Sequence, residues 1–167
     1  MGNKYYHYYV EGEDDKKIVN TLKTDFQIIE PGKVDVFNVV QNVINQNRIR
    51  VLKPNTTVIL VFDTDTGSAE ILKQNIEFLE KQQSIKKVVC IPQVNNLEDE
   101  LVRSCAIGSV KQLTNSESVA EFKSDFLKIN NLKEKLNEKA FDFTKFWSSI
   151  PQGAFKDIAN NSTEIKK

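Results

Sequence analysis

Acidic side chains are concentrated at two places in the chain, each directly after a run of apolar or aromatic residues. The first group is residues 11–15 (EGEDD), after the run 5–10, and the second is residues 63–65 (DTD), after the run 57–62. Like charges held close together destabilise one another and raise one another's pKa unless a cation neutralises them. Oxygen-only ligands that include a carboxylate pair suit Mg²⁺ or Mn²⁺. The two motifs therefore predict a site for a hard divalent cation.

The spacing of Asp63 and Asp65 favours a shared ion. In a strand that is just ending, residues two apart point the same way, so both carboxylates can reach one cation. Gly67 then lets the backbone turn tightly into the next helix. The alternative interpretation is that Asp65 or Thr66 only caps that helix, because acids are common at helix N-termini.

The elements that position these acids alternate between strand and helix patterns. The expected strands are residues 5–10, 26–29, 57–62 and 87–91, and the expected helices run through 18–22, 36–44, 68–83 and 97–105. This order predicts an α/β fold with a mostly parallel four-stranded sheet flanked by helices. Ligands of such sheets bind beyond the carboxyl ends of the strands. Three strand ends carry acids there, the last leading into Glu98, Asp99 and Glu100.

A change in composition near Gly108 predicts a domain of residues 1–107 and a helical C-terminal extension of residues 108–167 packed on it. Helical spacing runs through residues 119–136, and residues 160–167 are polar, so we expect them to be frayed. Aromatic residues follow the helical stretch. They are most simply the core of a helical cap, and a docking surface for a protein partner is the alternative; they are Phe141, Phe143, Phe146 and Trp147.

Composition narrows the class of protein. Of 167 residues, 40% are hydrophobic and 28% charged, and 23 basic residues balance 23 acidic ones, which argues against a globally basic nucleic-acid binder. Cys90 and Cys105 lie in apolar surroundings without a metal-ligand spacing, as expected of reduced thiols. The start of the chain has no secretory signal pattern, and no apolar run is long enough to span a bilayer. We expect a cytoplasmic protein with no membrane association.

Glu11-Gly12 after one apolar strand, followed about fifty residues later by Asp63-x-Asp65-x-x-Gly67 after another, resembles the TOPRIM domain. That domain is shared by topoisomerases, bacterial primases, small ribonucleases and OLD-type nucleases. The stretch VEGEDD is similar to the start of the small TOPRIM proteins. The resemblance covers roughly residues 5–105 and leaves the rest of the chain unexplained.

The resemblance implies a role for each matching residue. Glu11 would be the general acid/base or, as in some members, a further metal ligand, and Asp15 would match a second acid found in VEGxDD variants. Asp63 and Asp65 would hold Mg²⁺ or Mn²⁺. The other matches are a third acid at Glu98, with Asp99 and Glu100 as alternatives, and the turn glycines Gly12 and Gly67.

These implications predict a Mg²⁺-dependent nuclease acting on the phosphodiester bonds of DNA or RNA. Lys16 begins a helix beside the expected site, where it would contact a phosphate or simply remain solvated. One alternative function is a non-catalytic TOPRIM-fold interaction or regulatory subunit. Another is a HAD-like phosphatase with Asp63 as nucleophile, because VFDTDT also matches that motif; the motif normally lies on a first strand, however, and here a complete strand–helix unit precedes it.

Overall fold

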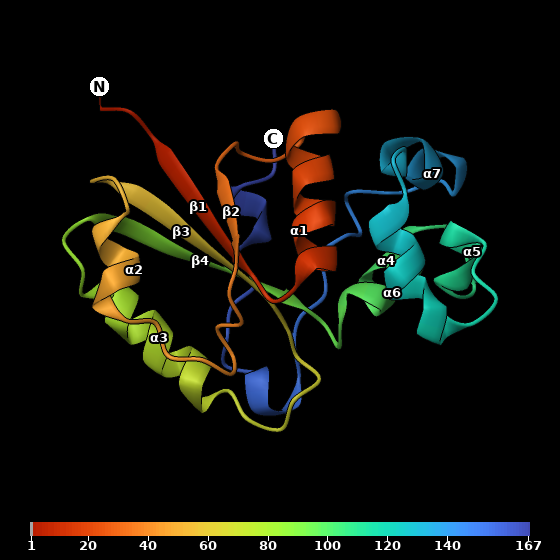
Figure 1. The fold of residues 1–167 in the computed structure, drawn as a ribbon. Coiled ribbons are helices and arrows are strands. Elements are labelled where there is room, and N and C mark those ends of the chain that lie inside the picture. The colour runs from red at the N-terminus through yellow and green to blue at the C-terminus, as the bar shows by residue number, and fades with distance from the viewer. Residues whose placement is uncertain (1) are drawn as a thin grey trace.

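A four-stranded, all-parallel sheet forms the centre of the protein in the computed structural model, which describes residues 2–167. The strands are β1 (Tyr5–Val10), β2 (Lys33–Val36), β3 (Thr56–Asp63) and β4 (Ile85–Gln93), in the order β2-β1-β3-β4 (Figure 1). The prediction of an α/β fold with a parallel four-stranded sheet flanked by helices is confirmed. The order makes β1 and β3 central neighbours and leaves β2 and β4 at the edges.

Strand β3 is covered on both faces, as its almost continuous apolar sequence predicts. Val58, Leu60 and Phe62 belong to one hydrophobic cluster, while Ile59 and Val61 belong to the other. All five side chains are fully buried. Alternation along the strand thus divides the core into two layers, one on each face of the sheet.

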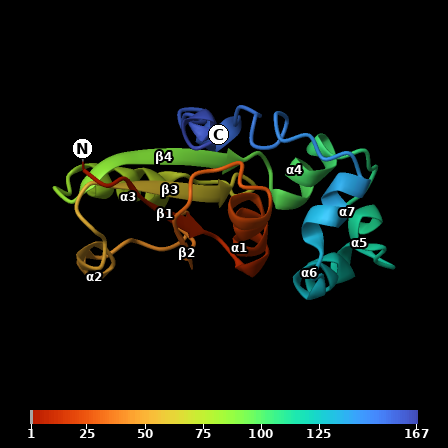
Figure 2. The same ribbon diagram turned by 90° about the horizontal axis from the view of Figure 1, so that it is seen from above.

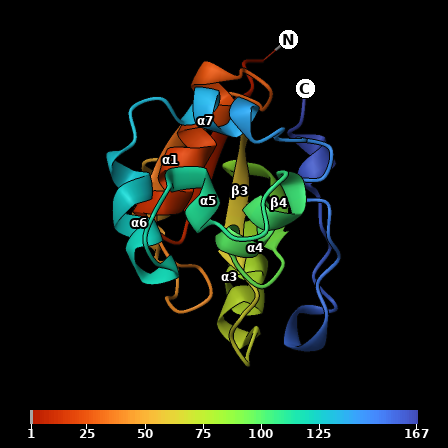
Figure 3. The same ribbon diagram turned by 90° about the vertical axis from the view of Figure 1, so that its right-hand side faces the viewer.

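Helices cover both faces. α1 (Glu13–Asn20), which continues into the π-helix η1 (Thr21–Asp25), packs on one face, and α2 (Gln46–Arg50) and α3 (Glu70–Glu80) pack on the other. Beyond β4 come α4 (Leu97–Ser104), α5 (Lys111–Thr114), α6 (Val119–Lys128) and α7 (Leu132–Glu138). Figure 3 looks from the carboxyl ends of the strands, with α4, α5 and α6 in front of the sheet. Within residues 2–167, no helix has the length and apolarity needed to cross a membrane.

The expected second strand, residues 26–29, is wrong. Gln27 has φ 57°, which interrupts an extended run, and Ile29 makes only an isolated antiparallel bridge with Lys166. The strand lies later, at β2, directly after Gly32. A Cβ built on Gly32 would stand 2.3 Å from the carbonyl oxygen of Tyr6, so only glycine lets the chain approach β1 this closely.

The expected helix through residues 36–44 is also wrong, because the chain forms a loop there. The buried side chain of Asn75 on α3 holds this loop. Its Nδ2 donates to the carbonyl oxygens of Val39 and Asn42, each at 2.8 Å, and its Oδ1 accepts from the N–H of Ile44 at 2.8 Å. These bonds satisfy backbone groups that a helix would otherwise pair, and the β-branched residues of the segment favour helix only weakly.

The C-terminal residues are ordered, so the expectation of frayed residues 160–167 is wrong. The backbone N–H of Asn161 donates to the carbonyl oxygen of Cys90 on β4 at 2.8 Å, and that of Lys167 donates to Ile28 at 2.9 Å. Ile165 is 1% exposed. Figure 2 shows this segment alongside β4, where it covers an edge strand that would otherwise offer unpaired backbone groups.

Candidate functional site

The carboxyl ends of β1, β3 and β4 bring three polar side chains together at the end of the sheet where the strands terminate. Val10 pairs with Val61, and Asp63 pairs with Gln93. Glu11 is the residue after β1, while Asp63 and Gln93 are the last residues of their strands. Since parallel strands all end at the same edge, these three residues become neighbours although they are distant in sequence.

Glu11 and Asp63 are in direct contact. The Oε1 atom of Glu11 accepts a hydrogen bond from the backbone N–H of Asp63 at 3.1 Å. The first acidic motif therefore meets the second, as the sequence predicts for acids at neighbouring strand ends.

Gln93 joins Asp63 to a third acid. Its side-chain Nε2 donates to Asp63 Oδ1 at 2.8 Å and to Asp15 Oδ1 at 2.9 Å. The Gln93 side chain is completely buried. Because a primary amide carries two N–H bonds, one bond is available for each carboxylate. Sequence reasoning missed Gln93, since a glutamine ending an apolar strand carries no distinctive signal.

Asp15 also has a structural role. Its Oδ2 accepts from the backbone N–H of Gly12 at 3.0 Å, as an acid at the third helical position does when it closes the start of a helix. With Gln93 bound to its other oxygen and only 3% exposure, Asp15 is held firmly beneath the site.

The three acids resist ionisation. Burial first, and then the charges of Asp15 and Glu11, raise the pKa of Asp63 to about 9. Burial and the charge of Asp14 raise the pKa of Asp15 to about 7. Burial also raises the pKa of Glu11, against the stabilising hydrogen bond from the Asp63 backbone. At neutral pH the isolated protein thus keeps a proton among these acids.

Asp65 lies outside the strand. β3 ends at Asp63, and the exposed Asp65 follows on a loop whose Thr64 donates its backbone N–H to the carbonyl oxygen of Asn95 at 3.1 Å. The charge of Asp65 nevertheless raises the pKa of both Asp63 and Glu11, so it stands within electrostatic reach of them. The expected common direction from a shared strand does not apply, because the pair spans a strand end and a loop.

The acids of α4 separate into different roles. Glu100 is fully buried and accepts from the backbone N–H groups of Val94 at 3.1 Å and Trp147 at 2.9 Å, and it pairs with Arg103 at 2.8 Å. These contacts make Glu100 a structural acid. Asp99 accepts from the side-chain amide of Asn95.

Glu98 is the α4 acid that faces Lys123. Lys123 of α6 places its Nζ 3.8 Å from Glu98 Oε1 and 3.9 Å from Asp14 Oδ2. The charges of Asp14, Glu98, Asp63 and Asp15 raise the pKa of Lys123 against the opposing effect of burial. Lys123 therefore lies within electrostatic reach of the acidic site. No sequence signal could have distinguished it from other helix lysines, because its position depends on how α6 packs on α1.

Other predicted site residues lie differently. Lys16 lines a separate hollow along α1 with Glu13 and Asn20. Gly12 has φ −148°, which any residue adopts, and among residues 2–167 the glycine with positive φ is Gly153. The predicted turns at Gly12 and Gly67 thus do not depend on left-handed backbone.

The aromatic residues expected as a helical cap lie in a largely irregular stretch between α7 and the 3₁₀ helix η2 (Gly153–Phe155). Phe146 and Trp147 are fully buried, and Phe141 and Phe143 pack against the same cluster. Their burial agrees with the interpretation as core residues. It removes Phe146 and Trp147 from any docking surface, so the alternative of aromatic helices that bind a protein partner is not supported.

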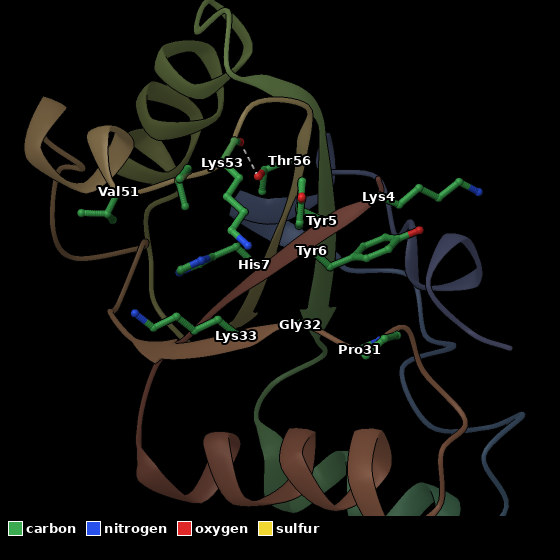
Figure 4. A pocket seen from close by; sticks show the side chains of 11 residues that line it. Lys4, Tyr5, Tyr6, His7, Pro31, Gly32, Lys33, Val51, Lys53 and Thr56 are labelled. Carbon is green, nitrogen blue, oxygen red and sulfur yellow. Dashed lines mark hydrogen bonds between the residues drawn. The ribbon is translucent and has the colours of Figure 1, made fainter. Parts of the chain in front are cut away.

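A hollow of about 350 Å³ lies at the opposite, amino end of β1 and β3. Figure 4 shows His7, Lys33 and Lys53 on one side of it and Lys4 and Tyr6 directed to the other. The imidazole Nε2 of His7 is already paired with Asp35 at 2.8 Å, and the lysines are surface residues. None of the predicted site residues lines this hollow.

The fold and the site define an α/β protein with an acidic, hydrogen-bonded cluster at the carboxyl edge of a parallel sheet. Comparisons with models of known protein families, with curated proteins and with solved structures found no match for the chain. Within residues 2–167, the structure contains no preformed group of three or more His, Cys, Asp or Glu side chains that could hold a metal ion. The functional groups of the cluster are carboxylates and one side-chain amide.

Proposed function

We propose that this chain is a TOPRIM-type nuclease that hydrolyses nucleic-acid phosphodiester bonds with the help of Mg²⁺ or Mn²⁺. One observation supports the proposal above the others: Glu11 and Asp63, which belong to the two motifs of the resemblance, are in contact at the ends of neighbouring strands. A Glu after one strand and an Asp-x-Asp motif after another can belong to one site only if the two strands are adjacent.

The donor atoms suit a hard divalent cation in their chemistry, although the described residues form no preformed metal site. Asp63 and Asp65 would hold the cation, with Glu98 as a further acid near the site, and all of their available ligand atoms are oxygens. Burial first, and then the charges of Asp15 and Glu11, raise the pKa of Asp63, and a bound cation would offset both effects. When bound, the cation would neutralise a phosphodiester oxygen and stabilise the charge that develops during displacement.

The chain's own residues supply the remaining functions. Glu11 has a raised pKa and only partial burial, so it is suited to carry a proton to or from the reacting group. Asp15 is enclosed by its two hydrogen bonds and orients Gln93 rather than touching substrate. Lys123 lies close to Asp14 and Glu98 and is free to swing toward a phosphate, since its two ion pairs are long.

A cleavage assay tests the proposal. Purified protein is incubated with single- and double-stranded DNA and RNA in Mg²⁺ and in Mn²⁺. We expect cleavage by the wild type, loss of at least a hundredfold in the Asp63→Asn/Asp65→Asn double variant and in Glu11→Gln, and no change in Glu77→Gln, an acid on α3 remote from the site. Full activity of Glu11→Gln would remove Glu11 from the mechanism.

The same preparation separates the alternatives. Binding of nucleic acid without cleavage under every condition would contradict the nuclease and favour an interaction subunit. Hydrolysis of a small phosphate monoester that is lost in Asp63→Asn, together with an aspartyl-phosphate analogue trapped on Asp63, would favour the phosphatase instead.

A further inference from the structure

The indole of Trp147 determines which way the side-chain amide of Gln93 faces. Trp147 Nε1 lies 3.1 Å from Gln93 Oε1. An indole N–H can only donate, so its partner must be the amide oxygen. The amide nitrogen then has to face the opposite way, toward Asp15 and Asp63. This donor logic assigns the orientation independently of the atom names in the side chain.

Trp147 is itself held in place on every polar atom. Its backbone N–H donates to the buried carboxylate of Glu100 at 2.9 Å. Its carbonyl oxygen accepts from Asn160 Nδ2 at 2.8 Å and from Ser162 Oγ at 2.7 Å. The residue is fully buried and has φ 60°, a left-handed conformation that is strained for a bulky side chain. Such strain persists only where the surroundings over-determine it, and it is often found at functional sites.

We infer that Trp147 is a positioning residue, which acts through Gln93 and, together with Asp15, holds Asp63 for the cation. The two donated N–H bonds hold one oxygen of Asp15 and one oxygen of Asp63 in place. Without the indole, the amide can turn its oxygen toward them, so Asp63 loses the bond that positions it and the cation site is weakened. The irregular segment after α7 thereby becomes part of the site. The claim about the cation rests on the proposed function, whereas the claim about the amide does not.

The first experiment observes the amide without any cation. In ¹⁵N-labelled, metal-free protein, the Gln93 side-chain NH₂ signals should exchange slowly with solvent. We expect Trp147→Phe, which keeps a ring but removes the donor, to speed this exchange roughly tenfold or more. Phe146→Leu, which alters the packing beside the indole but leaves its N–H, should not change it. Unchanged exchange in Trp147→Phe would overturn the inference.

The second experiment measures coupling. Mn²⁺ affinity is determined by calorimetry for the wild type, Trp147→Phe, Gln93→Met and the double variant. Loss of a residue that orients metal ligands typically weakens affinity about tenfold or more, so we expect about a tenfold loss in each single variant. The double variant should lose no more than Gln93→Met alone, because Trp147 acts only through Gln93. A full additional loss in the double variant would contradict this.

The outcomes distinguish the inference from the proposed function. If the amide responds to Trp147→Phe but the wild type binds neither Mn²⁺ nor Mg²⁺, the positioning role stands and the metal proposal fails. If Trp147→Phe does not fold, the wild-type indole provides the test, because the chain has a single Trp and hence one indole N–H resonance. That resonance should move clearly in Gln93→Met, and an unmoved resonance would overturn the inference.

Discussion

Asp63 shows most clearly the conflict between stability and a charged site. It is placed at the end of a central strand, where burial and neighbouring acids raise its pKa from 3.8 to about 9. A carboxyl group of this kind destabilises the folded protein whenever it ionises. Such a carboxyl group contributes little to folding, and the proposed cation site would give it a role.

Asp63→Asn should make the metal-free protein more stable and less sensitive to pH. Because the folded-state pKa is raised, the wild type holds a proton on Asp63 that the unfolded chain has lost. The stabilisation linked to Asp63 is complete below pH 4 and disappears as pH rises toward 9. Urea unfolding in EDTA at pH 8 should show Asp63→Asn more stable by about 2 kcal/mol. Asparagine keeps the oxygen that accepts from Gln93.

The difference between Asp63→Asn and the wild type should shrink as the pH of that experiment is lowered to 5. A variant less stable than the wild type at pH 8 would show that Asp63 is ionised and satisfied in the metal-free fold. That result would contradict a raised pKa of Asp63 in the folded protein.

Lys123→Met should weaken nucleic-acid binding at the site. The lysine is the cation that faces Asp14 and Glu98, and a phosphate entering the site would find it within reach. We expect the affinity for a single-stranded oligonucleotide to fall about fivefold and the slope against salt concentration to fall by about one. Fluorescence anisotropy at several salt concentrations measures both. Lys128→Met, at the exposed end of the same helix, is the control, and equal losses in the two variants would indicate a general charge effect.

The sequence predicted those site residues that can be identified from their immediate neighbours in the chain. Glu11 and Asp63 could be recognised because each acid directly follows an apolar strand, and parallel strands end together. Gln93, Trp147 and Lys123 could not be recognised. Their roles arise from contacts across 30 residues or more of chain or from the packing of one helix on another, and neither leaves a pattern in composition or spacing.

The elements were predictable where hydrophobic periodicity and length agree. β1, β3, β4, α3 and α4 all lie close to their expected ranges. The region between α1 and β3 was not predictable, because its conformation is fixed from outside the segment. The side chain of Asn75 and the carbonyl oxygen of Tyr6 decide where loop and strand lie, and both belong to other elements.

Gly32→Ala should destabilise the protein through the pairing of β2 with β1. The added methyl group would stand 2.3 Å from the Tyr6 carbonyl oxygen, so the backbone of one strand has to move. We expect a loss of about 3 kcal/mol in the free energy of unfolding, measured by chemical denaturation. Gly67→Ala is the matched control, because a Cβ there meets nothing within 4 Å, and it should change stability by less than about 0.5 kcal/mol. Similar losses would disprove the close approach.

At the scale of the whole molecule, the last residues of the chain pack against the sheet and so join the C-terminal segment to it. One hydrophobic cluster contains Tyr8 of β1, Leu113 of α5, Trp147 and Ile165, so the sheet and the segment after it share a core. Polar composition suggested a frayed end. That interpretation failed because Ile165 and the backbone of Asn161 find partners on distant elements.

Removal of residues 160–167 should therefore destabilise the fold and expose β4. The variant loses the burial of Ile165, worth about 2 kcal/mol, and the hydrogen bonds to Cys90. We expect a melting temperature lower by about 10 °C and concentration-dependent association in size-exclusion chromatography, because an uncovered edge strand pairs with other chains. Removal of the exposed residues 2–4 is the control. A truncated protein as stable as the wild type would contradict this account.

The position of Trp147 has a consequence for synthesis. All four strands leave the ribosome before the indole does, and domains begin to fold from the N-terminal side. During that interval Gln93 has no donor to orient it, and the clustered acids stand without their final arrangement. If the chain is the nuclease proposed above, it would become able to cleave nucleic acid only after translation had passed Trp147.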